Sequence, residues 1–108
     1  MRRTASRRSH KMGDSIMRDV AEILETESWD PRIEGVTVSG VRMNSDLSVA
    51  EILYSPSFMQ DENADEVQAA LDKASGFVRT KLAKRMKSKR VPEIRFVRDS
   101  FLEDMVYD

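Results

Sequence analysis

The residues best suited to chemistry in this chain are cations, and they gather in the stretch DKASGFVRTKLAKRMKSKR, residues 72–90. No acidic residue occurs from residue 73 to residue 89. A solvated helix face usually mixes both signs of charge, whereas a field of one sign repels itself and suits an anionic partner. The pattern predicts contacts with nucleic-acid phosphates, whose strength falls steeply as salt is added. The cations expected there are Lys73, Arg79, Lys81, Lys84, Arg85, Lys87, Lys89 and Arg90.

The net charge of −1 hides this cluster, because it averages blocks of opposite sign. Residues 1–12 sum to +5, residues 13–72 to −11, residues 73–98 to +9 and residues 99–108 to −4. We expect residues 1–11 to form a basic flexible tail, in which Arg7 and Arg8 add to the nucleic-acid contact. The acidic block is expected to be a solvated face, although it could also keep that side of the domain away from RNA. A different class of function stays open, namely an interaction adaptor whose basic helix docks on an acidic protein.

Catalytic and metal-binding chemistry finds little support. The chain has no cysteine and a single histidine, His10, so neither a zinc cluster nor a Cys–His pair can be assembled. The acidic residues lack the spacing of a calcium loop, and neither a P-loop nor a GxGxxG motif occurs. We therefore expect a protein without enzymatic activity, cofactor or bound metal.

Composition also bears on location. The lack of cysteine fits a reducing cytosol, and the longest apolar runs are far shorter than a membrane-spanning helix needs. The start MRRTASRRSHKMG is rich in Arg and Ser, as transit peptides are, but it has almost no apolar face. We expect a bacterial cytoplasmic protein that does not enter a membrane, with organellar targeting as the minor alternative.

The hydrophobic pattern predicts one α+β domain over residues 12–108. Apolar residues recur at helical spacing from about residue 14 until Pro31 ends the first helix. Residues 35–44 and 48–55 read as strands joined by the turn NSDL, which predicts an antiparallel hairpin, and residues 93–99 read as a third strand. Two further helical stripes lie on either side of Gly76. The predicted order is helix, strand, strand, helix, helix, strand.

A glycine within a helical pattern costs about 1 kcal/mol relative to alanine, so Gly76 predicts a bend between two helices. The small residues Ala74, Ser75 and Gly76 would let the two backbones approach closely and would leave N–H groups that can receive a phosphate. The alternative is a glycine that only caps a helix. Phe77 is expected to plug the bend or else to offer a stacking surface, and Trp29 to pack against the end of the first helix.

Four segments, in this order and spacing, resemble the ribosome-binding factor A family of bacterial small-subunit assembly factors. They are DPRI (30–33), SDLS (45–48), ASGFVR (74–79) and KRVPEIRFVRD (89–99), and the resemblance runs from about Met12 to Met105. It implies a type II KH-like domain of αββααβ order, with a three-stranded sheet and its helices packed on one face. The family replaces the GXXG loop of other KH domains by an Ala-x-Gly kink between the last two helices, matched here by Ala74-Ser75-Gly76.

The resemblance also implies a function. Members bind the 30S subunit or its precursor through 16S rRNA, support maturation of that rRNA and matter in cold adaptation, without enzymatic activity. We expect the same of this chain, acting as a monomer, with Ser75 and Gly76 at the kink among its nucleic-acid contacts. A ribonuclease acting on rRNA ends is less favoured, because the sequence offers no paired acid and base.

Overall fold

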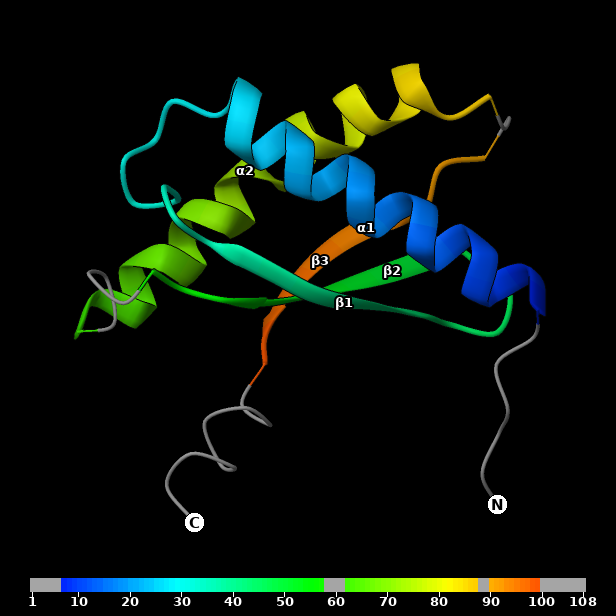
Figure 1. Cartoon of the computed structure of the whole chain (residues 1–108), viewed down its shortest axis with the longest axis horizontal. Coiled ribbons are helices and arrows are strands. Elements are labelled where there is room, and N and C mark those ends of the chain that lie inside the picture. The colour runs from blue at the N-terminus through cyan, green and yellow to red at the C-terminus, as the bar shows by residue number, and fades with distance from the viewer. Residues whose placement is uncertain (1–6, 58–61, 88–89, 100–108) are drawn as a thin grey trace, which may run out of the picture.

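The computed structural model describes residues 7–57, 62–87 and 90–99 of the chain. Its elements are α1 (Arg7–Glu27), β1 (Thr37–Met43), β2 (Val49–Ser55), α2 (Ala64–Arg85) and β3 (Glu93–Arg98). The strands form one three-stranded sheet in the order β1-β2-β3 (Figure 1). β1 and β2 are antiparallel, which confirms the predicted hairpin. β2 and β3 are parallel, so α2 is the crossover that connects them.

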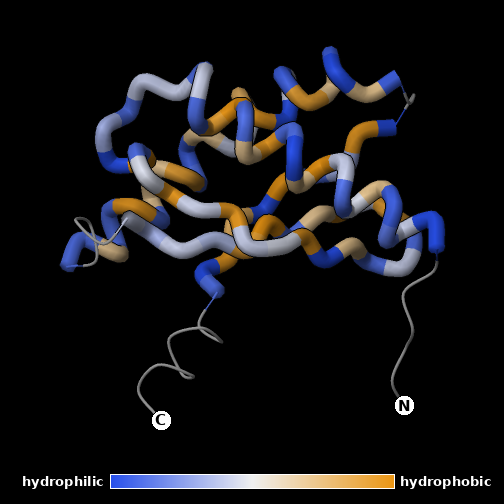
Figure 2. The backbone as a smooth tube through the Cα atoms, in the orientation of Figure 1, coloured by the Kyte–Doolittle hydropathy of each residue, from blue (hydrophilic) through white to orange (hydrophobic). Residues whose placement is uncertain are grey.

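One face of the sheet is buried, because apolar side chains alternate with polar ones along the strands. Ala50, Ile52 and Tyr54 of β2 are buried, as are Ile94 and Phe96 of β3. Both helices contribute to the same core, with Ile16, Val20 and Ile23 from α1 and Val67, Leu71, Val78 and Leu82 from α2. Figure 2 shows the corresponding alternation of apolar and polar stretches along both helices. The predicted α+β, type II KH-like architecture with helices on one face is thus confirmed.

A polar contact fixes α2 on the sheet. The Tyr54 hydroxyl donates to Gln68 Oε1 at 2.6 Å, and Gln68 Nε2 donates to the carbonyl oxygen of Phe96 at 2.9 Å. The Gln68 amide therefore joins β2 and β3 to α2 and satisfies the hydroxyl of a side chain that is only 1% exposed.

α2 corrects the prediction of two helices that meet at Gly76, since it is one continuous helix of 22 residues. Val67, Leu71, Val78 and Leu82 all lie in the core, so the apolar stripe passes Gly76 without interruption. The helix ends at Arg85, where the Met86 N–H donates to the Leu82 carbonyl oxygen at 2.9 Å. The Ala-x-Gly segment lies within a helix, and the two predicted helical stripes are successive parts of it.

α1 begins at Arg7, which is before the predicted domain boundary at Met12. The helix packs closely on β1 at Gly13, where an added Cβ would lie 3.7 Å from the Val41 carbonyl oxygen. Because α1 starts at Arg7, residues 7–11 are helical, whereas the sequence predicted them as part of a flexible tail. The rest of that tail and the terminal FLEDMVYD lie outside the described residues.

The connection from α1 to β1 is a compact turn built on Asp30. Its Oδ1 accepts from the Arg32 backbone N–H and from Arg32 Nε, each at 3.0 Å, and its Oδ2 accepts from Arg32 Nη2 at 2.7 Å. These bonds lower the pKa of Asp30 to about 2. The Ile33 N–H donates to the Asp30 carbonyl oxygen at 3.0 Å, and the Ile33 side chain is buried. The DPRI segment thus anchors the end of α1 to the core.

Gly35 closes this turn in a conformation that disfavours other residues. Its φ is +82°, and an added Cβ would lie 2.8 Å from Ser57 Cβ. We predict that Gly35→Ala lowers the free energy of unfolding by about 1–2 kcal/mol, measured by urea denaturation. Gly40→Ala is the matched control, because its Cβ would meet only Leu53 Cδ1 at an ordinary 3.6 Å. Equal stability of the wild type and Gly35→Ala would contradict the strain assigned to this turn.

Candidate nucleic-acid interface

The C-terminal half of α2 presents a solvent-facing row of cations and small residues. Residues 73, 76, 80 and 84 follow one another at intervals of three or four, which places them along one side of the helix, and residue 87 follows just beyond its end. We call this surface the α2 strip; its members are Lys73, Gly76, Thr80, Ala83, Lys84 and Lys87, and all are exposed. Within the described part of the chain, none of its three lysines forms an ion pair.

Gly76 leaves the backbone of the α2 strip uncovered. A Cβ added there would meet no atom within 4 Å, so the glycine is not required for packing inside the protein. This corrects the expectation that small residues let two helices approach closely at this point. Ser75 bonds locally, since its hydroxyl donates to the Asp72 carbonyl oxygen at 2.9 Å, and Ala74 is partly buried against the core.

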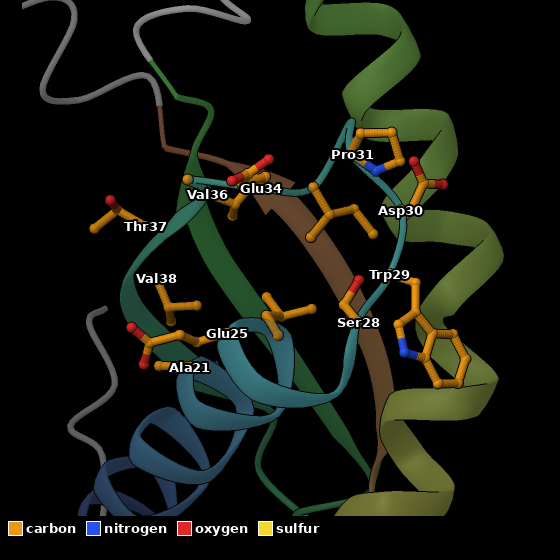
Figure 3. Close-up of a pocket in the computed structure, with 13 residues that line it drawn as sticks. Ala21, Glu25, Ser28, Trp29, Asp30, Pro31, Glu34, Val36, Thr37 and Val38 are labelled. Carbon is orange, nitrogen blue, oxygen red and sulfur yellow. The ribbon is translucent and has the colours of Figure 1, made fainter.

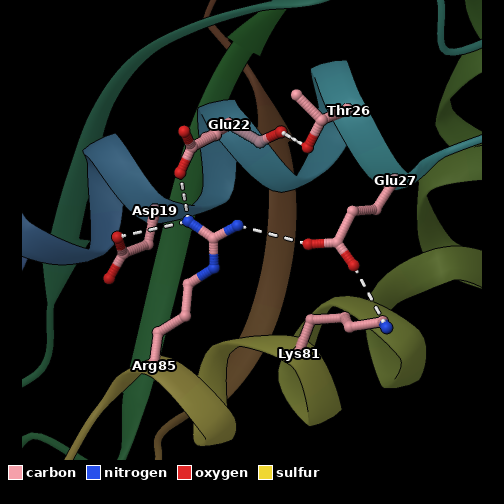
Figure 4. A network of polar contacts seen from close by, with 6 residues as sticks. All are labelled: Asp19, Glu22, Thr26, Glu27, Lys81 and Arg85. Carbon is pink, nitrogen blue, oxygen red and sulfur yellow. Dashed lines mark hydrogen bonds and ion pairs between the residues drawn. The ribbon is translucent and has the colours of Figure 1, made fainter.

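Two of the predicted contact cations face α1 instead of solvent (Figure 4). Arg85 forms ion pairs with Glu22, with Asp19 at 3.7 Å and with Glu27 at 3.2 Å. Lys81 Nζ lies 3.1 Å from Glu27 Oε1. The bond to Glu22 is the main reason that the pKa of Arg85 is raised, and the bond to Lys81 is the main reason that the pKa of Glu27 is lowered.

This network changes the interpretation of the acidic block. Asp19, Glu22 and Glu27 were expected to belong to a solvated face, but they bind the cations of α2. The positive charges of Lys81 and Arg85 are therefore balanced within the protein, and both side chains are only about one-third exposed.

Arg79 lies on the side of α2 opposite to Lys81 and Arg85, toward the segment that leads into β3. Its Nε donates to the Pro92 carbonyl oxygen at 3.1 Å, and its Nη2 donates to the Val91 carbonyl oxygen at 2.8 Å. Carbonyl oxygens accept these bonds without cancelling the charge of the guanidinium, so Arg79 still contributes to the positive field. Arg90 follows α2 in the connection to β3 and is exposed, whereas Lys89 lies outside the described residues.

Arg7 and Arg8 are not brought to the α2 strip. Both are exposed in the first turn of α1. At 1.5 Å per residue, Arg7 lies about 18 Å along the helix from Asp19, where α1 meets Arg85. Arg7 and Arg8 form a second, separate basic surface at the start of α1.

The aromatic residues near α2 differ from expectation. Trp29 was predicted to pack against the end of the first helix, but it is 87% exposed. Its ring lies 6.2 Å from that of Phe77, centroid to centroid, at an angle of 45°. Phe77 is partly buried against the core, and Lys81 Nζ lies 5.5 Å from its ring centroid. α2 continues without a break past Phe77, and the sequence pattern around Trp29 gives no sign of its exposure.

Two hollows flank Trp29. The larger, about 720 Å³, lies between α1 and β1 and carries Glu25 and Glu34, with Trp29 at its edge beside α2 (Figure 3). The smaller, about 290 Å³, lies between Trp29 and α2 and is lined by Lys73, Ala74 and Phe77 among others. In the part of the chain that the structure describes, no group of acidic or histidine residues is suited to hold a metal ion, and no helix is long and apolar enough to cross a membrane.

Comparisons with known proteins agree on one family. Residues 8–107 match the family model of ribosome-binding factor A. The chain is 41% identical over 96 residues to ribosome-binding factor A of Limosilactobacillus fermentum, covering 89% of this chain and 80% of that protein. The crystal structure of ribosome-binding factor A from Thermus thermophilus is similar with a TM-score of 0.73 and 27% identity, covering 83% of this chain and 93% of that one.

A second structural relative is a homology model of the Thermus thermophilus ribosome-binding factor A fitted into the cryo-EM map of its complex with the 30S subunit. It is similar with a TM-score of 0.66 and 28% identity, covering 82% of this chain and 91% of that one.

The exposure of Gly76 predicts a gain in stability when it is replaced. Gly76→Ala adds a methyl group in open space within a helix, so we expect the free energy of unfolding to rise by about 0.5–1 kcal/mol. Urea denaturation of the purified protein measures the change. A destabilised Gly76→Ala protein would mean that the fold itself needs the glycine.

The α1–α2 network predicts a pH-dependent stability. Arg85→Met keeps the aliphatic stem and removes the ion pairs, so its urea midpoint should be lower than that of the wild type at pH 7 and low salt. The pKa of Glu27 is lowered mainly by Lys81 and also by Arg85, so the stability of the Arg85–Glu27 pair is complete above the ordinary value of 4.5 and is lost as pH falls below it. The difference in urea midpoint between Arg85→Met and the wild type should therefore become smaller below pH 4.5.

Arg42→Met is the matched control for this experiment. It removes an exposed pair with Glu51 on the outer face of the sheet, which should change stability little. Equal urea midpoints for Arg85→Met and the wild type at pH 7 would show that the network does not hold the two helices together.

Proposed function

Because this chain belongs to the ribosome-binding factor A family, we propose that it binds the small ribosomal subunit, or a precursor of it, through 16S rRNA. The relative fitted into a 30S complex supports the choice of subunit. The observation that carries the proposal is the α2 strip, where three lysines point to solvent and form no ion pair with any described residue.

The α2 strip suits a ribose-phosphate backbone in charge and in shape. A lysine ammonium binds phosphate as a compact point charge with three donors. Lys73 and Lys84 stand on either side of Gly76 and Ala83, whose small side chains leave room for a chain of phosphates to approach the helix. Lys87 extends the charge beyond the end of α2.

Other cations take secondary parts in this proposal. Arg79 adds to the field while its donors remain bonded to backbone, and the exposed Arg90 continues the basic surface toward β3. Lys89, outside the described residues, is proposed as a further contact from the sequence alone. Lys81 and Arg85 hold α2 against α1 and thereby set the orientation of the α2 strip. Arg7 and Arg8 provide a second contact at the start of α1, directed to a separate part of the RNA.

The protein would act by binding alone, as a monomer in the bacterial cytoplasm, where small subunits are assembled. By favouring one fold of the rRNA it would support maturation of 16S rRNA. Misfolded RNA helices persist longer at low temperature, so a factor that stabilises the correct fold would matter most in cold adaptation.

Removal of two α2-strip lysines tests the proposal. We predict that Lys84→Gln with Lys87→Gln weakens co-sedimentation with purified 30S subunits and lowers the slope of log affinity against log salt by about 1 for each lysine. Both side chains are exposed, so circular dichroism and the urea midpoint should stay unchanged.

Arg42→Gln with Arg95→Gln is the matched control, since it removes the same charge from the outer face of the sheet, where both arginines pair with neighbouring glutamates. Its affinity and salt slope should match those of the wild type. If both double variants lose the same affinity for 30S subunits, binding depends only on net charge, and the α2 strip is not a specific contact surface. Binding to protein-free 16S rRNA should also be measured, because an adaptor for an acidic protein would show none.

A further inference from the structure

Trp29 has an exposure that the core does not explain. It is the only large hydrophobic residue that is exposed in the described part of the chain, at 87%. The residues next to it are well anchored: Asp30 binds Arg32, and Ile33 is 3% exposed. The turn therefore holds its backbone in place and presents the indole to solvent at a fixed position.

The indole stands beside a second aromatic ring and a hollow. Phe77 lies 6.2 Å away, ring to ring, and its 45° tilt leaves the two rings unstacked. The hollow of about 290 Å³ between Trp29 and α2 has Ala70, Ala74, Phe77 and Val78 in its lining, which gives it an apolar wall. A flat apolar group that enters here would touch both rings.

The charges around this hollow favour an occupant that carries phosphate. Lys73 lies on its rim, one helical turn before Phe77, and forms no ion pair with a described residue, although its charge helps to lower the pKa of Asp30 on the same rim. The carboxylates on the rim are already balanced, since Glu27 pairs with Lys81 at 3.1 Å and Asp30 with Arg32 at 2.7 Å. The acidic hollow with Glu25 and Glu34 lies on the other side of Trp29 and would repel a phosphate there.

We propose that Trp29 and Phe77 form a stacking site for an unpaired base of RNA, whose phosphate binds Lys73. This inference rests on the proposed function and adds to it a contact with a single-stranded nucleotide beside the contacts with phosphates. Stacking on an aromatic ring accepts any base, so the site selects an unpaired nucleotide at one position and not a sequence. Lys73 belongs to both surfaces and joins the stacked base to the α2 strip.

Fluorescence tests the site directly, because Trp29 is the only tryptophan in the chain. We expect its emission to be quenched when the wild type binds protein-free 16S rRNA or a short oligoadenylate. An abasic ribose-phosphate oligomer of the same length should leave the emission nearly unchanged. Quenching by rRNA that the abasic oligomer reproduces would contradict stacking.

Substitutions then separate stacking from charge. Trp29→Ala should weaken binding to protein-free 16S rRNA about tenfold without changing the salt slope, whereas Trp29→Phe should retain much of the affinity. Lys73→Gln should reduce the salt slope by about 1. Because Trp29 is exposed, the urea midpoint of Trp29→Ala should match that of the wild type.

The outcomes distinguish this inference from the proposed function. If the wild type binds 30S subunits and depends on Lys84 and Lys87, while Trp29→Ala binds 16S rRNA as tightly as the wild type, the stacking site is wrong and the function stands. If the indole is quenched by intact 30S subunits but not by protein-free 16S rRNA, Trp29 contacts a ribosomal protein and the inference is overturned. If the wild type binds neither subunits nor rRNA, the proposed function itself fails.

Discussion

The packing of α1 against α2 decides which charges this domain offers to a partner. Both helices lie on one face of the sheet, and three carboxylates of α1 meet Lys81 and Arg85 of α2 along their contact. A helix of 3.6 residues per turn cannot direct all its side chains to one side, so neighbouring cations separate. Lys81 and Arg85 stabilise the helix pair, and the lysines at 73, 84 and 87 face solvent.

The acidic block has a structural role, because its carboxylates on α1 bind two of the cations of α2. The chain carries 18 basic and 19 acidic residues, and three carboxylates of the acidic block, Asp19, Glu22 and Glu27, are paired with cations of α2. Exposed ion pairs contribute little singly, but Arg85 meets three carboxylates at a helix contact where each partner limits the movement of the others. On the solvent-facing side of α2, the lysines at 73, 84 and 87 keep charges that no described carboxylate pairs with, and a polyanion would meet them there.

The same helix carries an uncovered backbone and an aromatic neighbour. Gly76 costs the helix stability and gains no packing within the protein, so its presence is better explained by a surface that must approach a partner closely. Trp29 is similar, because an indole left in water forgoes burial that a small domain could use. Both lie near Lys73 and Ala74, and together they mark one end of the α2 strip as the place where an RNA strand would lie closest to the protein.

The sequence by itself determined which regions are helical and which are strands, the hairpin and the family, since these follow from local periodicity, turn residues and short motifs such as DPRI. It also located the basic stretch on a helix. It did not show that α2 is continuous through Gly76, because the local cost of glycine suggested a break and the uninterrupted burial of Val78 and Leu82 outweighs that cost. Only the tertiary structure decided which cations are balanced and which aromatic ring is exposed. Ion pairs between Glu22 and Arg85, or contact between Trp29 and Phe77, join residues far apart in the chain, and their distances follow from how the helices cross on the sheet.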